Sequence, residues 1–188
     1  DAASGLSFQL TAAVPNTSLK TNLDAQWADF RGAAYQDGKL VGTGTTNNSV
    51  IDTPTPIESE DGMLYWATLI GDGYGNDAVG CPILAGDAII TYSGKTIYRV
   101  DPDTGEVLNQ GQMESNSSFS IVPPTYSDGM VFVGLKDGTV QAFDAVTLES
   151  LWVYHDPLGG QPNCPITVKD GYLDAGFWNG EAKPPNYV

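Results

Sequence analysis

An internal repeat of about 41 residues constrains the fold of this chain more than any other feature of its sequence. Each copy begins with a proline, and the three prolines are 42 residues apart (82 to 124) and then 41 apart (124 to 165). A glycine-containing turn and a short apolar segment follow each proline in the same order. A repeat of this length is typical of folds in which one supersecondary unit stacks on the next.

The segments between the turns predict β-strands rather than helices. They are short, rich in β-branched and aromatic residues, and bounded by turn dipeptides such as Asp128-Gly129. The clearest strands are 88–92, 96–100, 130–134 and 139–143. Four strands per repeat predict an all-β fold built of four-stranded antiparallel blades, which are the units of a β-propeller.

Residues 128–152 resemble the repeat of a known family. They read D-G-M-V-F-V-G-L-K-D-G-T-V-Q-A-F-D-A-V-T-L-E-S-L-W, which is similar to the repeat of the pyrroloquinoline-quinone (PQQ)-like, or quinoprotein alcohol dehydrogenase-like, β-propellers. That repeat ends in a tryptophan docking motif, whose tryptophan packs between blades. Ala142, Thr147 and Trp152 match the motif, so the resemblance implies that these three residues pack blade against blade.

The chain also departs from this family pattern at two places. Leu148 stands where the motif usually has glycine, and Asn109 stands where the preceding repeat should have tryptophan. Thr104 and Gly105 of that preceding repeat do match. The resemblance is therefore strong for the fold, but it says little about activity.

The resemblance covers about residues 27–188, beginning at a Trp27–Gly32 segment similar to the W-x-x-x-R-G that opens such propellers. We interpret 1–26 as an N-terminal extension or the tail of a preceding domain. We interpret 27–188 as an incomplete PQQ-like propeller of about three to four blades. Because closed propellers need about four to eight blades, we expect a piece of a larger ring. Its open blade edges would favour a homo-oligomer.

The charge of the chain excludes several classes of partner. Eight lysines and arginines against 23 aspartates and glutamates give a formal net charge of −15. Nucleic acids and anionic membrane surfaces both require clustered basic residues, so neither is expected as a partner. There is no apolar run of membrane-spanning length, so we expect no membrane insertion.

Three functional classes share this repeat: quinoprotein dehydrogenases, outer-membrane assembly lipoproteins, and bacterial cell-surface proteins without evident enzyme activity. The chain is most similar to the last class. The resemblance thus implies an extracellular, cell-surface or secreted, non-catalytic binding or scaffold module that presents loops to a protein or carbohydrate. The alternatives are a fragment of a quinoprotein-type dehydrogenase and a scaffold like the outer-membrane assembly lipoproteins.

No cofactor and no catalytic residue are expected. Family enzymes hold PQQ on the axis of a complete eight-bladed ring, with Ca²⁺ and often two adjacent cysteines, whereas Cys81 and Cys164 lie far apart. We interpret both cysteines as small, buried and unpaired. His155 is the only histidine and has no nucleophile or zinc motif beside it, so we interpret it as a structural or solvated residue of an inter-blade loop.

One loop offers the oxygen ligands that Ca²⁺ prefers. Asp72, Asn76 and Asp77 lie within a glycine-rich segment. The EF-hand spacing is absent, and the segment falls where an inter-blade turn belongs. We therefore interpret it as a turn, with a calcium site as the weaker alternative, and expect no metal.

The best candidate for ligand binding is the segment Phe177-Trp178-Asn179, where two bulky aromatic residues precede a turn. Aromatic rings beside amide side chains can bind a sugar or a protein partner. The alternative is that the aromatic residues serve only to pack the blades.

Overall fold

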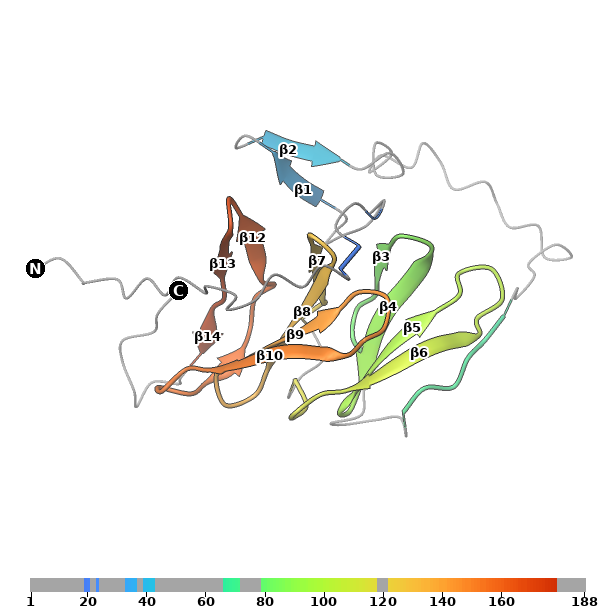
Figure 1. Ribbon diagram of the computed structural model, residues 1–188. Helices are drawn as coiled ribbons and strands as arrows, with labels where there is room; N and C mark the ends of the chain where they lie inside the picture. The colour runs from blue at the N-terminus through green and yellow to red at the C-terminus, as the bar shows by residue number, and fades with distance from the viewer. Residues whose placement is uncertain are drawn as a thin grey trace, which may run out of the picture.

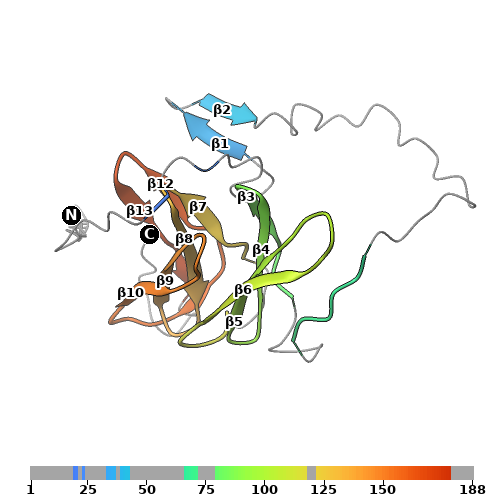
Figure 2. The same cartoon turned by 45° about the vertical axis from the view of Figure 1, so that its right-hand side comes forward.

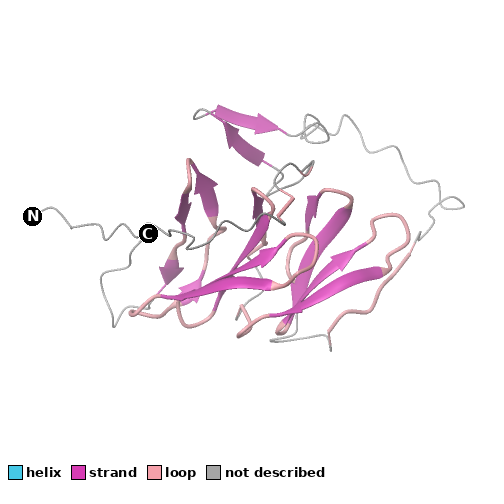
Figure 3. Ribbon diagram, viewed as in Figure 1, coloured by secondary structure: helices cyan, strands magenta, loops and turns pink. Residues whose placement is uncertain are grey.

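The computed structural model describes residues 19, 20, 23, 33–36, 39–42, 66–71, 79–117 and 122–178. All regular secondary structure in these residues is β-strand, as Figure 3 shows. No helix in the described part is long and apolar enough to cross a membrane. The predicted boundary at residue 27 lies outside the described residues.

Two complete four-stranded antiparallel sheets confirm the predicted blades. The first sheet has the order β3-β4-β5-β6 and the second β7-β8-β9-β10, so each is a simple meander. Their strands are β3 (Ile83–Ala85), β4 (Ala88–Ser93), β5 (Thr96–Val100), β6 (Val107–Gln112), β7 (Thr125–Ser127), β8 (Met130–Leu135), β9 (Thr139–Asp144) and β10 (Ser150–His155). Strands β4, β5, β8 and β9 coincide with the four segments that the sequence predicted, to within one residue.

A third unit comes after the second sheet in the chain. It comprises the hairpin β12 (Thr167–Lys169) and β13 (Tyr172–Asp174), together with the pair β11 (Gln161–Pro162) and β14 (Phe177–Trp178). Strands β3, β7 and β12 begin at residues 83, 125 and 167, which are 42 residues apart each time. Figures 1 and 2 show the first sheet, the second sheet and the third unit side by side in chain order, which is the arrangement of part of a β-propeller. A separate hairpin contains β1 (Ala33–Gln36) and β2 (Lys39–Gly42).

The Asp-Gly pairs act as the predicted hairpin turns. Asp128 and Asp170 have φ angles of 51° and 52°, and the glycines that follow them have φ angles of 79° and 80°. Each pair is the whole connection between two strands. Two successive residues with positive φ match the right-handed twist of the strands, and Asp-Gly tolerates this conformation better than most dipeptides.

The core consists of two apolar clusters, one on each side of the second sheet. Val131, Val133 and Leu135 of β8 belong to a cluster that the first sheet shares. Phe132, between them, belongs to a second cluster with Ile166 of the third unit. Since successive residues of a strand point to opposite faces, β8 is buried on both faces. This explains why its sequence is continuously apolar rather than alternating.

Tyr92 lies in the first cluster and is fully buried. Its hydroxyl donates a hydrogen bond to the Val122 carbonyl, in the segment that leads to β7. Burial raises the pKa of Tyr92 to about 12 from its ordinary value of 10.0. The phenol therefore stays neutral in the folded protein under conditions that ionise it in the unfolded chain.

The loss of unfolding free energy on truncating a valine to alanine should depend on how deeply that valine is buried. We expect Val131→Ala, at 0% exposure, to lower the free energy of unfolding by about 2 kcal/mol. Val107→Ala, at 37% exposure on the outer strand β6, should cost about 0.5 kcal/mol or less. Urea denaturation followed by circular dichroism measures both values, and equal costs would contradict the burial of Val131 between the sheets.

Alkaline pH should destabilise the fold through Tyr92. A group whose pKa is raised in the folded state stabilises it below the unfolded pKa, and that stabilisation disappears as the pH rises through the folded pKa. We expect a loss of about 2–3 kcal/mol between pH 10.0 and about 12. Across this pH range, the free energy of unfolding should fall less steeply for Tyr92→Phe than for the wild type. Parallel pH profiles would contradict the prediction.

Candidate functional site

The three residues of the predicted docking motif occupy different surroundings. Ala142 is fully buried in the second cluster. Trp152 is half-buried on β10 and packs beside Phe132, with ring centroids 5.8 Å apart and planes inclined by 44°. Thr147 is exposed in the turn after β9, where its N–H donates to a carboxylate oxygen of Asp144 over 2.8 Å. A packing role between blades stays a prediction for these residues.

Trp66, which lies outside the strands, packs on the turn between β5 and β6. Its indole Nε1 donates a hydrogen bond of 2.9 Å to the Pro102 carbonyl. A Cβ on Gly105 would lie 2.5 Å from the indole ring, far inside contact distance, and the φ angle of Gly105 is 75°. Position 105 therefore requires glycine for two reasons, the backbone conformation and the space that Trp66 occupies.

Between the first and second sheets, the corresponding positions hold two different residues, Asn109 and Leu148. Leu148 takes the place of the glycine, keeps a positive φ of 57°, and buries its side chain in the first cluster. Asn109 takes the place of the tryptophan, and its Nδ2 donates to the Val146 carbonyl over 2.6 Å. By analogy with Trp66 on Gly105, a tryptophan at 109 would collide with the Leu148 side chain. The two departures from the family pattern therefore compensate for each other.

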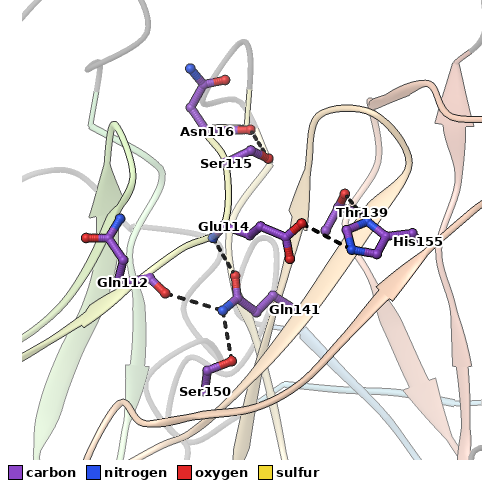
Figure 4. A network of polar contacts seen from close by, with 8 residues as sticks. All are labelled: Gln112, Glu114, Ser115, Asn116, Thr139, Gln141, Ser150 and His155. Carbon is purple, nitrogen blue, oxygen red and sulfur yellow. Dashed lines mark hydrogen bonds and ion pairs between the residues drawn. The ribbon is translucent and has the colours of Figure 1, made fainter.

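A polar network, shown in Figure 4, joins the first two blades. The buried Gln141 side chain accepts the Glu114 N–H over 2.9 Å and donates to the Gln112 carbonyl and to Ser150 Oγ. Gln112 ends the outer strand of the first sheet, whereas Gln141 and Ser150 belong to the second. One amide thus connects three segments.

His155 lies beside this network rather than in an inter-blade loop, because it is the last residue of β10. Its Nε2 is 3.1 Å from Glu114 Oε1, and its Nδ1 is 3.1 Å from Thr139 Oγ1. A carboxylate, an imidazole and a hydroxyl in a row resemble a hydrolase triad. However, Thr139 is only 3% exposed, so its hydroxyl is closed to a substrate. No sequence motif signalled this arrangement, since its members come from three separate segments.

The predicted ligand-binding segment is split between the core and the surface. Phe177 packs against the second cluster, whereas Trp178 is 50% exposed. Asn179 lies outside the described residues. Phe177 is half-buried and Trp178 is exposed, and a ligand-binding role for this segment stays a prediction.

Tyr172, which the sequence analysis did not select, is exposed at 60%, as Trp178 is at 50%. Tyr172, Asp174 and Trp178 are exposed, whereas Leu173, Ala175 and Phe177 are half-buried and pack against the second cluster. We call the three exposed residues the aromatic face. Gln161 pairs with Trp178 across β11 and β14, and its buried Oε1 has no hydrogen-bond partner among the described residues.

A hollow of about 560 Å³ lies on the first sheet. Arg99 and Asp87 form an ion pair at its edge. Hydrogen bonds from the backbone N–H groups of Thr104 and Asp103 lower the pKa of Asp101, which also lines the hollow. With its arginine paired, the hollow is acidic.

The remaining candidates have different outcomes. Asp72, Asn76 and Asp77 lie outside the described residues, and no metal-binding group of three His, Cys, Asp or Glu occurs within the described ranges. Cys81 and Cys164 are unpaired but exposed, so the prediction that they are buried is wrong. Both precede the first strand of their repeat instead of lying within it.

These observations define the class as a propeller protein of PQQ-like repeats. A family model described as outer membrane protein assembly factor BamB matches residues 55–170, more than half of the chain. The chain belongs to this family, as the sequence resemblance predicted. A search of curated proteins found no match.

Solved structures show partial similarity. BamB from Moraxella catarrhalis is 26% identical, with a TM-score of 0.42 over 53% of this chain and 30% of that one. A quinohemoprotein alcohol dehydrogenase from Pseudomonas putida is 20% identical, with a TM-score of 0.45 over 53% and 16%. A europium-containing methanol dehydrogenase is 21% identical, with a TM-score of 0.45 over 57% and 22%. The chain thus spans less than a third of the length of each.

The tight contact between Trp66 and Gly105 makes a testable prediction. Gly171 has a similar φ of 80° but nothing within 4 Å of where its Cβ would stand. Gly171→Ala should therefore cost only the conformational term, about 1–2 kcal/mol. Gly105→Ala should cost about 1–3 kcal/mol more, because it also crowds the indole. Thermal and urea unfolding of the two variants measure the difference, and equal values would contradict the contact.

Proposed function

We propose that this chain is a non-catalytic binding and scaffold module of the bacterial cell envelope, facing the outside, that holds a protein partner on the aromatic face. The observation that carries the proposal is the exposure of Tyr172 at 60% and Trp178 at 50% on one stretch of chain. Tyrosine and tryptophan are the residues most enriched among the energetic anchors of protein interfaces. Membership of a family described as an assembly factor supports a scaffold role.

The aromatic face is held by the core behind it. Leu173, Ala175 and Phe177 lie in the same stretch of chain and pack against the second cluster, which includes Ile166. Ordering this stretch of chain is thus part of folding rather than of binding. A preorganised surface retains more of its contact energy as affinity.

Charge indicates the chemistry of the partner. The chain has a net charge of −15, and Asp174 lies between the two aromatic residues. A partner with a basic side chain between apolar ones would complement this arrangement. Long-range attraction would also speed the encounter at low ionic strength.

The outer strands of the two sheets, β6 and β10, could pair with a second copy of the chain. β6 and β10 each end their sheet with no further strand among the described residues, and β6 carries no charged side chain over Val107–Gln112. Uncharged edges of this kind can pair with a second copy. Light scattering of the purified protein distinguishes a homo-oligomer from a monomer that is free to bind another protein.

Trp178→Ala should weaken partner binding about thirtyfold, which corresponds to a hot-spot loss of about 2 kcal/mol. Leu158→Ala is the matched control, because Leu158 is 45% exposed but lies outside the aromatic face. Envelope proteins cross-linked to a photoreactive group at position 172 supply the partner, and biolayer interferometry measures its affinity for each folded variant.

Three outcomes would contradict the proposal. Equal losses for Trp178→Ala and Leu158→Ala would exclude the aromatic face. Binding on a glycan array without a protein partner would favour the carbohydrate alternative. Binding of added PQQ with Ca²⁺ in a spectroscopic titration would favour the dehydrogenase fragment.

A further inference from the structure

Three Asp-Gly turns in the described residues provide an internal comparison. The aspartates of Asp128-Gly129, Asp137-Gly138 and Asp170-Gly171 have φ angles of 51°, 61° and 52°. The glycines have φ angles of 79°, 70° and 80°. The three pairs therefore share both their chemistry and their backbone conformation, so any difference in their reactivity must come from their surroundings.

The turn at Asp128-Gly129 is held from both sides. The Gly129 N–H donates to Tyr126 Oη over 3.2 Å. Ser127 Oγ donates to a carboxylate oxygen of Asp128 over 2.9 Å. Gly129 is also buried, since a Cβ there would lie 2.8 Å from the Lys20 carbonyl oxygen.

The turn at Asp137-Gly138 is held through its glycine. The Gly138 N–H donates to the Gly160 carbonyl over 2.8 Å, and its own carbonyl accepts the Asp156 N–H over 2.8 Å. Gly138 is buried as well, with the Gly159 Cα 2.9 Å from where a Cβ would stand. This amide nitrogen is therefore engaged and covered.

The turn at Asp170-Gly171 lacks these restraints. Both residues are exposed, and no heavy atom lies within 4 Å of where a Gly171 Cβ would stand. The described part of the chain gives the Gly171 N–H no hydrogen-bond acceptor. The hairpin that it closes has three residues in each strand, most of them exposed or half-buried. Local opening of such a hairpin requires little free energy.

We propose that Asp170-Gly171 is a site of spontaneous isoaspartate formation. The Gly171 amide nitrogen attacks Cγ of the Asp170 side chain and forms a new C–N bond. The hydroxyl of the protonated side-chain carboxyl leaves with the amide hydrogen as one water molecule, so the product is a cyclic succinimide. Water then adds to the main-chain carbonyl of residue 170 and breaks its bond to the nitrogen. Water lost equals water gained, and neither an oxidant nor a reductant takes part.

The modification changes the hairpin. The backbone now runs through Cβ and Cγ of residue 170, so the turn gains one methylene group, and the former main-chain carboxyl becomes the side chain. Because a two-residue turn sets the register of its strands, the pairing of Lys169 with Tyr172 is disturbed. Tyr172 belongs to the aromatic face, but the modification does not depend on any function of that face.

Ageing the intact protein in mildly acidic buffer tests the proposal. Peptide mapping with electron-based fragmentation resolves isoaspartate at each Asp-Gly and Asn-Gly pair separately, including the pairs outside the described residues. The 170–171 peptide should accumulate isoaspartate at least about fivefold faster than the 128–129 and 137–138 peptides. That factor corresponds to the net contribution of one hydrogen bond. In denaturant the three rates should converge, because their dipeptides are identical.

Two variants complete the test. Asp170→Gly keeps a turn that accepts positive φ but removes the reacting carboxyl. It should abolish the signal of this peptide in labelling by isoaspartyl methyltransferase. Asp137→Gly is the matched control and should leave that signal unchanged. Equal native rates at the three turns, or a faster reaction at 128 or 137, would overturn the proposal.

Discussion

The packing of one blade against the next is the constraint on which the rest of this structure depends. Strand β8 has no solvent-facing side: Val131 and Val133 contact the first sheet, and Phe132 contacts the third unit. A single four-stranded sheet cannot bury both of its faces, so each blade is stable only between neighbours.

One contact between blades differs from its counterpart in both of its partners. Where Trp66 covers a turn, Gly105 leaves it the space. Where Asn109 replaces the tryptophan, Leu148 fills the core with its own side chain in spite of a left-handed backbone. The departures from the family pattern at Asn109 and Leu148 thus belong to one altered contact between two blades.

Local features of the site were predictable, whereas the choice between neighbouring side chains was not. Strands and Asp-Gly turns follow from residues adjacent in sequence, and the structure confirms them. Phe177 and Trp178 look equivalent in sequence, yet the strand direction sends one inward and the other outward. Cys81 was expected to be buried because cysteine usually is, but its place ahead of the first strand exposes it.

By itself, the sequence determined the repeat, the four-stranded unit, the family and the acidic surface, because each is set by spacing, periodicity or composition. Only the tertiary structure decided which residues meet across blades. It brought Glu114, Thr139 and His155 into one row, left Tyr172 and Trp178 exposed, and left Gly171 uncovered while burying Gly129. These outcomes depend on the register of the strands and on the packing of one sheet against the next, which residues distant in sequence settle together.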